Sequence, residues 1–214
     1  MQDYKGDFIE FLVGAGVLTF GEFMTKSGRQ TPYFVNTGNY RTGKQLERLG
    51  SFYAQALTEH WDKDYDNLYG PAYKGIPLAV TTGIALQARH NHDISITYNR
   101  KEAKDHGEGG ALVGAELKGN VLITDDVISA GTSVRESIEW IRQAHANPCG
   151  VAIALDRQER GQGEKSAAQE VTTDFGIPVI AIAGLDDLIE FLESQSVANI
   201  DIGAIRRYRK DYGI

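Results

Sequence analysis

The stretch of the chain that decides the fold runs from residue 121 to residue 133 and reads VLITDDVISAGTS. Its first residues are apolar and mostly β-branched, which predicts a buried parallel strand. Two carboxylates, Asp125 and Asp126, end the strand, and a loop of small residues leads into a helix. Ser133 and Glu136 have capping-box spacing, so we expect them to cap this helix. A helix start favours anions, and ligands of open α/β sheets bind where strands end, so the stretch predicts an anion site.

Length and composition indicate an ordinary globular chain. Its 214 residues, 42% hydrophobic and 24% charged, suit one α/β domain that carries a small appendage. No apolar run approaches the ~20 residues of a membrane span, and the N-terminus lacks the layout of a signal peptide. Cys149 is the single cysteine, so an intrachain disulfide is impossible, which fits a reducing compartment. We therefore expect a cytoplasmic protein without membrane association.

The net charge of −7 argues against nucleic acid as a partner, because such a surface needs a basic face. It also sets a condition on any polyanionic ligand. The cations for that ligand must be gathered in a few loops, and a divalent metal ion should assist them.

Strand and helix patterns alternate from residue 67 onward. Predicted strands at 67–69, 94–98, 121–125, 151–155 and 178–182 are separated by predicted helices at 76–90, 133–146, 165–175 and 185–195. This order predicts an α/β fold, with a mainly parallel twisted sheet and helices on both faces. Ahead of it we expect a helix at 3–14, a β-hairpin at 18–36 outside the main sheet, and a helix at 42–61. The prediction is a single domain over 1–214, with a small hood formed mainly by 1–40.

A second informative stretch covers residues 99–110 and reads NRKEAKDHGEGG. It holds three cations and a histidine (Arg100, Lys101, Lys104 and His106), followed by three glycines. Few apolar residues anchor it, so we expect a mobile loop at about 100–114. Two interpretations fit this stretch about equally well. It closes over bound phosphates, or it is only a solvent-exposed charged loop.

These motifs resemble those of a known enzyme family. The stretch 121–133 resembles the phosphoribosyl pyrophosphate (PRPP) signature of the type I phosphoribosyltransferases and is not a Walker P-loop. The pattern Arg-Lys-x-x-Lys-x-His-Gly at 100–107 resembles the catalytic loop of the orotate phosphoribosyltransferases. Residues 23–36 are similar to the hood hairpin of that family and residues 70–77 to its pyrophosphate loop. The resemblance extends from about residue 4 to the C-terminal helix.

The resemblance implies roles for individual residues in PRPP binding and catalysis. Asp125 and Asp126 would hold the ribose hydroxyls, with Asp126 also supporting positive charge at the anomeric carbon. The implied catalytic residues are Lys101, Lys104, His106 and Asp126. The implied PRPP-binding residues are Lys26, Tyr73, Lys74, Arg100, Lys101, Lys104, His106, Asp125, Asp126, Val127, Ile128, Ser129, Ala130, Gly131, Thr132 and Ser133. Whether His106 would act as a general acid or only stabilise charge stays open.

The resemblance also implies a site for orotate. Its residues would be Lys26, Phe34, Val35, Ser129 and Arg157, with Phe34 and Val35 flanking the ring. Ser129 and Arg157 would hold its polar edge and carboxylate. Val35 stands where an aromatic residue is frequent in the family, and Ser129 where threonine is frequent. Neither change removes a functional group that the reaction needs.

The implied reaction converts orotate and PRPP into orotidine 5′-monophosphate and pyrophosphate, a step of pyrimidine nucleotide (UMP) synthesis. Positive charge grows on the ribose and negative charge on the diphosphate, so carboxylates and cations are needed at separate places. Mg²⁺ would be held mainly by PRPP, with Asp125 as the candidate protein contact. The resemblance further implies a homodimer in which the 100–110 loop acts on the neighbouring subunit's site.

Two other functions fit part of the sequence. A phosphoribosyltransferase for another base would share the 121–133 stretch, but Arg157, Lys26 and the hood suit an acidic pyrimidine. A regulatory module that senses PRPP could keep Asp125 and Asp126, but it would have little use for the cations of the 100–110 loop.

Overall fold

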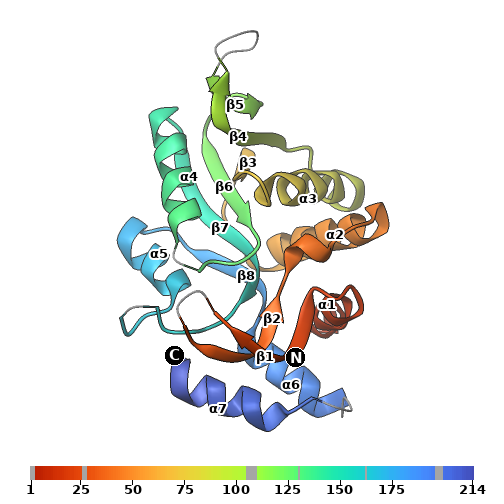
Figure 1. Cartoon of the computed structure of the whole chain (residues 1–214). Coiled ribbons are helices and arrows are strands. Elements are labelled where there is room, and N and C mark those ends of the chain that lie inside the picture. Colours follow the sequence, from red (N-terminus) through yellow and green to blue (C-terminus); the bar gives the residue numbers. More distant parts are fainter. Residues whose placement is uncertain (1–2, 26–27, 105–109, 130, 162, 196–199) are drawn as a thin grey trace.

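The computed structural model describes residues 3–25, 28–104, 110–129, 131–161, 163–195 and 200–214 (Figure 1). Its helices are α1 (Asp3–Gly14), α2 (Gly43–His60), α3 (Gly75–His90), α4 (Thr132–Gln143), α5 (Ala167–Phe175), α6 (Leu185–Gln195) and α7 (Ile202–Tyr212), with a 3-10 turn at Thr37–Asn39. Its strands are β1 (Leu18–Met24), β2 (Gln30–Val35), β3 (Asn67–Gly70), β4 (Ser95–Lys104), β5 (Gly110–Gly114), β6 (Asn120–Asp125), β7 (Asn147–Asp156) and β8 (Val179–Gly184). None of the helices in this described part combines the length and apolar character that a bilayer crossing requires.

Six strands form the main sheet in the order β5-β4-β3-β6-β7-β8. All neighbours are parallel except the pair β4 and β5. Strand β6 lies in the middle, with Leu122 opposite Leu68 of β3 and Ile123 opposite Val151 of β7. The predicted α/β class and mainly parallel sheet are therefore confirmed, and the 121–133 stretch does begin in the central strand.

Alternate residues of the central strands face opposite layers. Leu122 and Ala152 belong to a core that includes residues of α1, α2, α3 and α6, whereas Ile123 and Val151 belong to a second core with residues of α4 and α5. Figure 1 shows α4 and α5 on one side of the sheet and α2 and α3 on the other. Because both faces are covered, the strands read as continuous apolar runs, as the sequence predicted.

The N-terminal hairpin forms a sheet of its own, as predicted. Strands β1 and β2 pair antiparallel, with Phe20 opposite Tyr33. Tyr33 has no exposed surface, and its ring packs edge-on against Tyr208 of α7, with 6.1 Å between ring centroids. The hairpin and α7 therefore lie side by side (Figure 1), and the C-terminal helix supports the hood from below in that view.

The prediction of an irregular loop over residues 100–114 is wrong in part. Residues 100–104 continue β4, and residues 110–114 return as β5 in an antiparallel ladder that pairs Tyr98 with Val113. Backbone pairing does not depend on apolar side chains, so a polar segment can form an edge hairpin, and charges suit such an edge. The hairpin extends away from the rest of the molecule at the top of Figure 1. Residues 105–109 lie outside the described part.

Candidate functional site at the carboxyl edge of the sheet

Asp125 is a buried carboxylate at the end of β6, with 7% of its surface exposed. Its Oδ1 accepts a hydrogen bond from the backbone N–H of Asp126 (2.9 Å), and its Oδ2 accepts one from the hydroxyl of Ser133 (3.0 Å). Burial, and then the neighbouring charge of Asp126, raise the pKa of Asp125 from 3.8 to about 6. The carboxylate is thus held by the strand end and the helix start, which fixes its orientation.

Asp126 joins three separate parts of the chain. Its Oδ2 accepts a hydrogen bond from Thr37 Oγ1 (2.5 Å) and lies 2.9 Å from Nζ of Lys74. Its Oδ1 accepts from the backbone N–H of Val127 (2.8 Å). The hood, the start of α3 and the end of β6 therefore meet at this one carboxylate.

Helix α4 begins differently from our prediction. Its N-cap is Gly131, whose φ of 71° is left-handed, and no side chain of the described residues caps it. The capping box expected from Ser133 and Glu136 is therefore wrong, because the Ser133 hydroxyl donates to Asp125 instead. A helix start without a side-chain cap keeps backbone N–H groups for a ligand, so the predicted anion site keeps its physical basis.

The segment 70–77 packs tightly between β3 and α3. A Cβ added to Gly70 would lie 2.3 Å from the carbonyl oxygen of Gly75, so only glycine fits there. The backbone N–H of Ala72 donates to Oδ1 of Asn99 on β4 (2.8 Å). The next residue, Tyr73, is 66% exposed, and Nζ of Lys101 lies 5.0 Å from its ring centroid. The predicted pyrophosphate loop and the start of the predicted catalytic loop, which lies on β4, therefore touch each other in one chain.

Arg157 follows the end of β7 and lies against the hood. Its Nε donates to Oε1 of Glu159 (2.8 Å), and its guanidinium lies 5.0 Å from the ring centroid of Tyr33. Phe34 is 44% exposed and stacks on Phe23, with 5.5 Å between centroids. An exposed ring on the hairpin and a half-buried guanidinium on the sheet suit a planar ligand with an acidic group.

The remaining predicted residues have mixed outcomes. Val35, Val127 and Ile128 are partly buried and pack against the two cores, so their side chains serve the fold. Ser129 is exposed in the loop before α4, Thr132 is exposed at the first position of α4, and Arg100 is half-buried on β4. Three predicted residues, Lys26, His106 and Ala130, lie outside the described residues. Lys104 ends β4, but its side chain is likewise not described.

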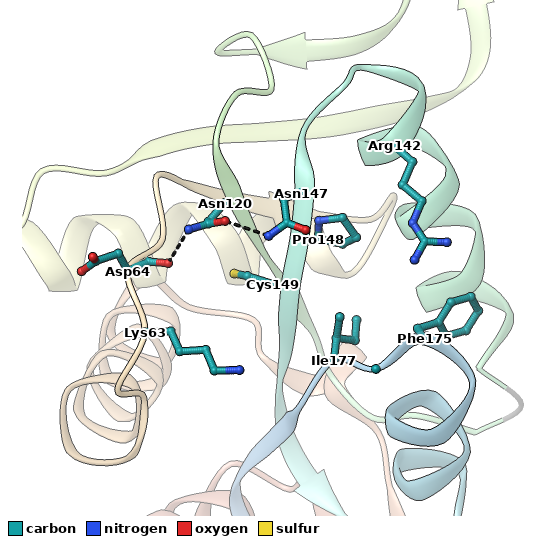
Figure 2. Close-up of a pocket in the computed structure, with 10 residues that line it drawn as sticks. Lys63, Asp64, Asn120, Arg142, Asn147, Pro148, Cys149, Phe175 and Ile177 are labelled. Atoms are coloured by element: carbon teal, nitrogen blue, oxygen red, sulfur yellow. Dashed lines mark hydrogen bonds between the residues drawn. The ribbon is translucent and has the colours of Figure 1, made fainter.

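A hollow of about 440 Å³ lies at the opposite edge of the sheet, where β6 and β7 begin (Figure 2). None of the described residues that line it is a predicted site residue. Arg142 stands in the last turn of α4, and its guanidinium lies 5.9 Å from the ring centroid of Phe175. A cation at a helix C-terminus complements the helix dipole, so this arrangement is explained without a ligand. The carboxyl edge is therefore the better candidate.

Comparisons with known proteins show the family to which the chain belongs. No family model matches the chain. The orotate phosphoribosyltransferase of Thioalkalivibrio sulfidiphilus is 56% identical over 214 residues and covers 100% of both chains. The solved orotate phosphoribosyltransferase of Francisella tularensis is 38% identical, covers 97% of this chain and 100% of that one, and has a TM-score of 0.87. The chain belongs to the orotate phosphoribosyltransferase family.

The function is accordingly the transfer of ribose 5-phosphate from PRPP to orotate, which gives orotidine 5′-monophosphate and pyrophosphate. This decides against a phosphoribosyltransferase for another base, which the central strand alone could not exclude. A solved Mycobacterium tuberculosis orotate phosphoribosyltransferase, described as a complex with PRPP, is 20% identical and covers 86% of this chain and 98% of that one. At a TM-score of 0.64 that likeness shows the fold alone.

Several contacts at this orotate phosphoribosyltransferase site were not predicted from the sequence. Thr37 and Lys74 share Asp126, Tyr53 donates to the backbone carbonyl of Asp125 (2.7 Å), and Glu159 holds Arg157. Thr37 and Asp126 are 89 positions apart. No local pattern joins positions so distant, so the single sequence could not have indicated the contacts of Asp125 and Asp126 with Thr37, Tyr53 and Lys74.

Proposed function

We propose that the carboxyl edge of the sheet holds PRPP with its ribose at Asp125 and Asp126, its 5′-phosphate at the loop 127–133, and its diphosphate beside Tyr73 and Lys74. The observation that carries this proposal is the junction at Asp126. One carboxylate there contacts both the hood through Thr37 and the diphosphate side through Lys74, at 2.5 and 2.9 Å. A sugar bound at this carboxylate would lie between the acceptor and the leaving group.

The charges of these residues suit the displacement. As the bond to the diphosphate breaks, positive charge develops on the ribose, and the buried carboxylate of Asp126 would stabilise it. Negative charge develops on the diphosphate, and Lys74 would stabilise it together with Arg100 and Lys101. We propose that Lys26, Lys104 and His106 complete this set of cations, as the family resemblance implies.

The acceptor would enter from the hood side. Phe34 offers an exposed ring face, and Arg157 offers guanidinium N–H groups to oxygens of the base. Val35 packs on the core, so we propose that it fixes the backbone of the hood on which the base would rest. Ser129 is exposed within the loop before α4 and would donate to the polar edge of the base.

A divalent ion fits this site as a ligand of the substrate. Among the described residues, no three His, Cys, Asp or Glu side chains cluster as a metal site. Both oxygens of Asp125 already accept protein hydrogen bonds. Mg²⁺ is commonly bound through substrate phosphates and one or two carboxylates, so PRPP would supply most of its ligands, with Asp125 as the protein contact. The ion would neutralise charge on the departing diphosphate.

We further propose a homodimer that forms through the outer face of α3. Ile84 is 61% exposed there, in helical register with Val80 and Pro77, and Tyr73 lies just before the helix. Apolar residues that are exposed or half-buried at this spacing are typical of a helix face covered by a partner.

We also propose a cytoplasmic location. This proposal rests on the single cysteine, Cys149, which is buried and has no second cysteine with which to form an intrachain disulfide.

The proposal is tested by following orotate loss by its ultraviolet absorbance with PRPP, in the presence of Mg²⁺ and after its removal by a chelator. Asp126→Asn should lower turnover by on the order of 10²–10³, the usual cost of one positioned electrostatic group. Uracil, adenine and hypoxanthine serve as control acceptors. Full turnover by Asp126→Asn, or by the chelated enzyme, would contradict the respective assignment.

A further inference from the structure

A buried polar cluster lies beneath the acceptor side of the site. Arg157 Nε donates to Oε1 of Glu159 at 2.8 Å, and Nη2 lies 2.7 Å from the same oxygen. The hydroxyl of Tyr33 donates to that oxygen as well, at 2.8 Å. Burial raises the pKa of Tyr33 well above its ordinary value, so the hydroxyl keeps the proton that it donates. A single carboxylate oxygen therefore accepts two hydrogen bonds, one from Arg157 and one from Tyr33, and also forms an ion pair with Nη2.

The guanidinium of Arg157 is only partly used by these contacts. Its side chain is 21% exposed, and that of Glu159 is 14% exposed. Glu159 lies beside both Nε and Nη2, but within the described part of the chain the 2.7 Å contact of the buried Nη2 is an ion pair without hydrogen-bond alignment. A buried guanidinium donor without a well-aligned partner is costly, and an oxygen of a ligand would relieve that cost.

The segment that carries both residues is fixed from outside the sheet. Arg29 of the hood donates from Nη1 to the carbonyl of Arg160 (2.7 Å) and from Nη2 to that of Gly161 (3.0 Å). The backbone N–H of Arg160 donates to the carbonyl of Tyr212 (2.8 Å). Glu159 is therefore held on a rigid segment, which a residue that orients another side chain requires.

We propose that Glu159, supported by Tyr33, is a positioning residue that fixes the guanidinium of Arg157 and so selects the acceptor by hydrogen-bond geometry. This inference rests on the proposed role of Arg157 in binding orotate. Glu159 offsets the charge of Arg157, so Arg157 attracts an anion only weakly. The direction of its remaining N–H groups then discriminates between acceptor bases. The acceptor class is a planar base that carries acidic oxygens on one edge.

The test compares Glu159→Ala with Glu159→Gln in the orotate assay. Glu159→Ala leaves Arg157 free to rotate, and we expect the KM for orotate to rise on the order of tenfold while the KM for PRPP stays within about twofold. Glu159→Gln keeps an acceptor oxygen without the charge, so it should restore most of the loss. If charge mattered more than geometry, both variants would lower the KM for orotate, and the proposal would be overturned.

A double-mutant cycle separates positioning from a structural role. In an Arg157→Ala background, Glu159→Ala should add no further rise in the KM for orotate, because Glu159 acts only through Arg157. An equal rise in that background would overturn the proposal. Tyr33→Phe keeps the ring and removes the hydroxyl donor, so it should raise the KM for orotate by a smaller factor. An unchanged KM would contradict the supporting role of Tyr33. Melting temperatures identify any variant that fails to fold.

The outcomes distinguish this inference from the proposed function. If Arg157→Ala leaves the KM for orotate unchanged, the assignment of Arg157 is wrong and the positioning role falls with it. If Arg157→Ala raises that KM and Glu159→Ala does not, only the positioning role is wrong.

Discussion

The ammonium of Lys74 lies 2.9 Å from Oδ2 of Asp126, although the Lys74 side chain is 59% exposed and the Asp126 side chain only 10%. A half-exposed cation on a buried carboxylate contributes little to stability but is free to turn toward an incoming anion. We expect Lys74→Ala to change the free energy of unfolding by less than about 1 kcal/mol. Its KM for PRPP should rise on the order of tenfold, with a weaker dependence on salt.

Lys118→Ala is the matched control for this prediction. Lys118 forms an ion pair with Glu116 at 2.7 Å, and both side chains are more than 70% exposed, away from the proposed site. Its removal should leave both KM values unchanged. A wild-type KM for PRPP in Lys74→Ala would show that Lys74 pairs only with Asp126.

Asp125 predicts a pH dependence of stability. Its pKa is raised from 3.8 to about 6, so the folded chain binds a proton between about pH 4 and pH 6 that the unfolded chain does not hold. Stability therefore falls as pH rises through this range, and the full penalty persists above it. Asp125→Asn should be more stable than wild type at pH 8 by up to about 3 kcal/mol, and this difference should shrink toward pH 4. Urea unfolding at a series of pH values measures it.

The same titration affects catalysis in the opposite sense. Below about pH 6 the charged carboxylate is lost, so kcat/KM for PRPP should fall on the acid side in wild type. Asp125→Asn should show a low value without this acid limb. A stability difference that is constant from pH 4 to pH 8 would mean that the pKa of Asp125 is not raised.

The sequence predicted the parts of this fold that are encoded locally. The strand that ends at Asp125 is apolar because both faces of the sheet are covered, and this shows directly in consecutive residues. The capping box failed because Ser133 has a tertiary partner, the carboxylate of Asp125, that lies outside the helix. The hairpin of β4 and β5 was missed because its pairing is between backbones, while its side chains are those of a loop.

The candidate site was predictable as a set of residues and not as a set of contacts. Asp126 and Lys74 each stood in a recognisable motif, but neither motif contains the other residue. Thr37 and Glu159 belong to no motif at all, and they act on residues that do. The contacts of Thr37 with Asp126 and of Tyr33 with Glu159 depend on the packing of distant segments, which one sequence does not display.

The close approach at Gly70 predicts a loss of stability. A Cβ there would lie 2.3 Å from a backbone oxygen of Gly75, so Gly70→Ala must displace the start of α3. We expect a loss of about 2–4 kcal/mol in the free energy of unfolding, typical of overpacking in a core. Gly43→Ala is the control, because nothing lies within 4 Å of the added Cβ. Its stability should be equal or slightly higher by urea unfolding.

Subunit mixing tests whether the 100–110 segment acts on a neighbouring site. Lys104→Ala alone should lower turnover by on the order of 10²–10³, and Asp126→Asn by a similar factor. In a hybrid dimer the subunit with intact Asp126 would meet the partner's intact Lys104, which restores one complete site. Equal mixing should therefore recover about a quarter of wild-type turnover, because about half of the dimers are hybrids with one working site.

Each outcome of the mixing experiment has a definite meaning. If Lys104 acted within its own subunit, every site of the hybrid would lack one of the two residues, and mixing would recover nothing. If Lys104→Ala by itself stayed within about threefold of wild type, the role of this hairpin in catalysis would be wrong. A mixture prepared without subunit exchange, from separately cross-linked homodimers, is the control and should stay inactive. Recovery that depends on exchange is thus expected only when the charged hairpin of one subunit completes the Asp126 site of its partner.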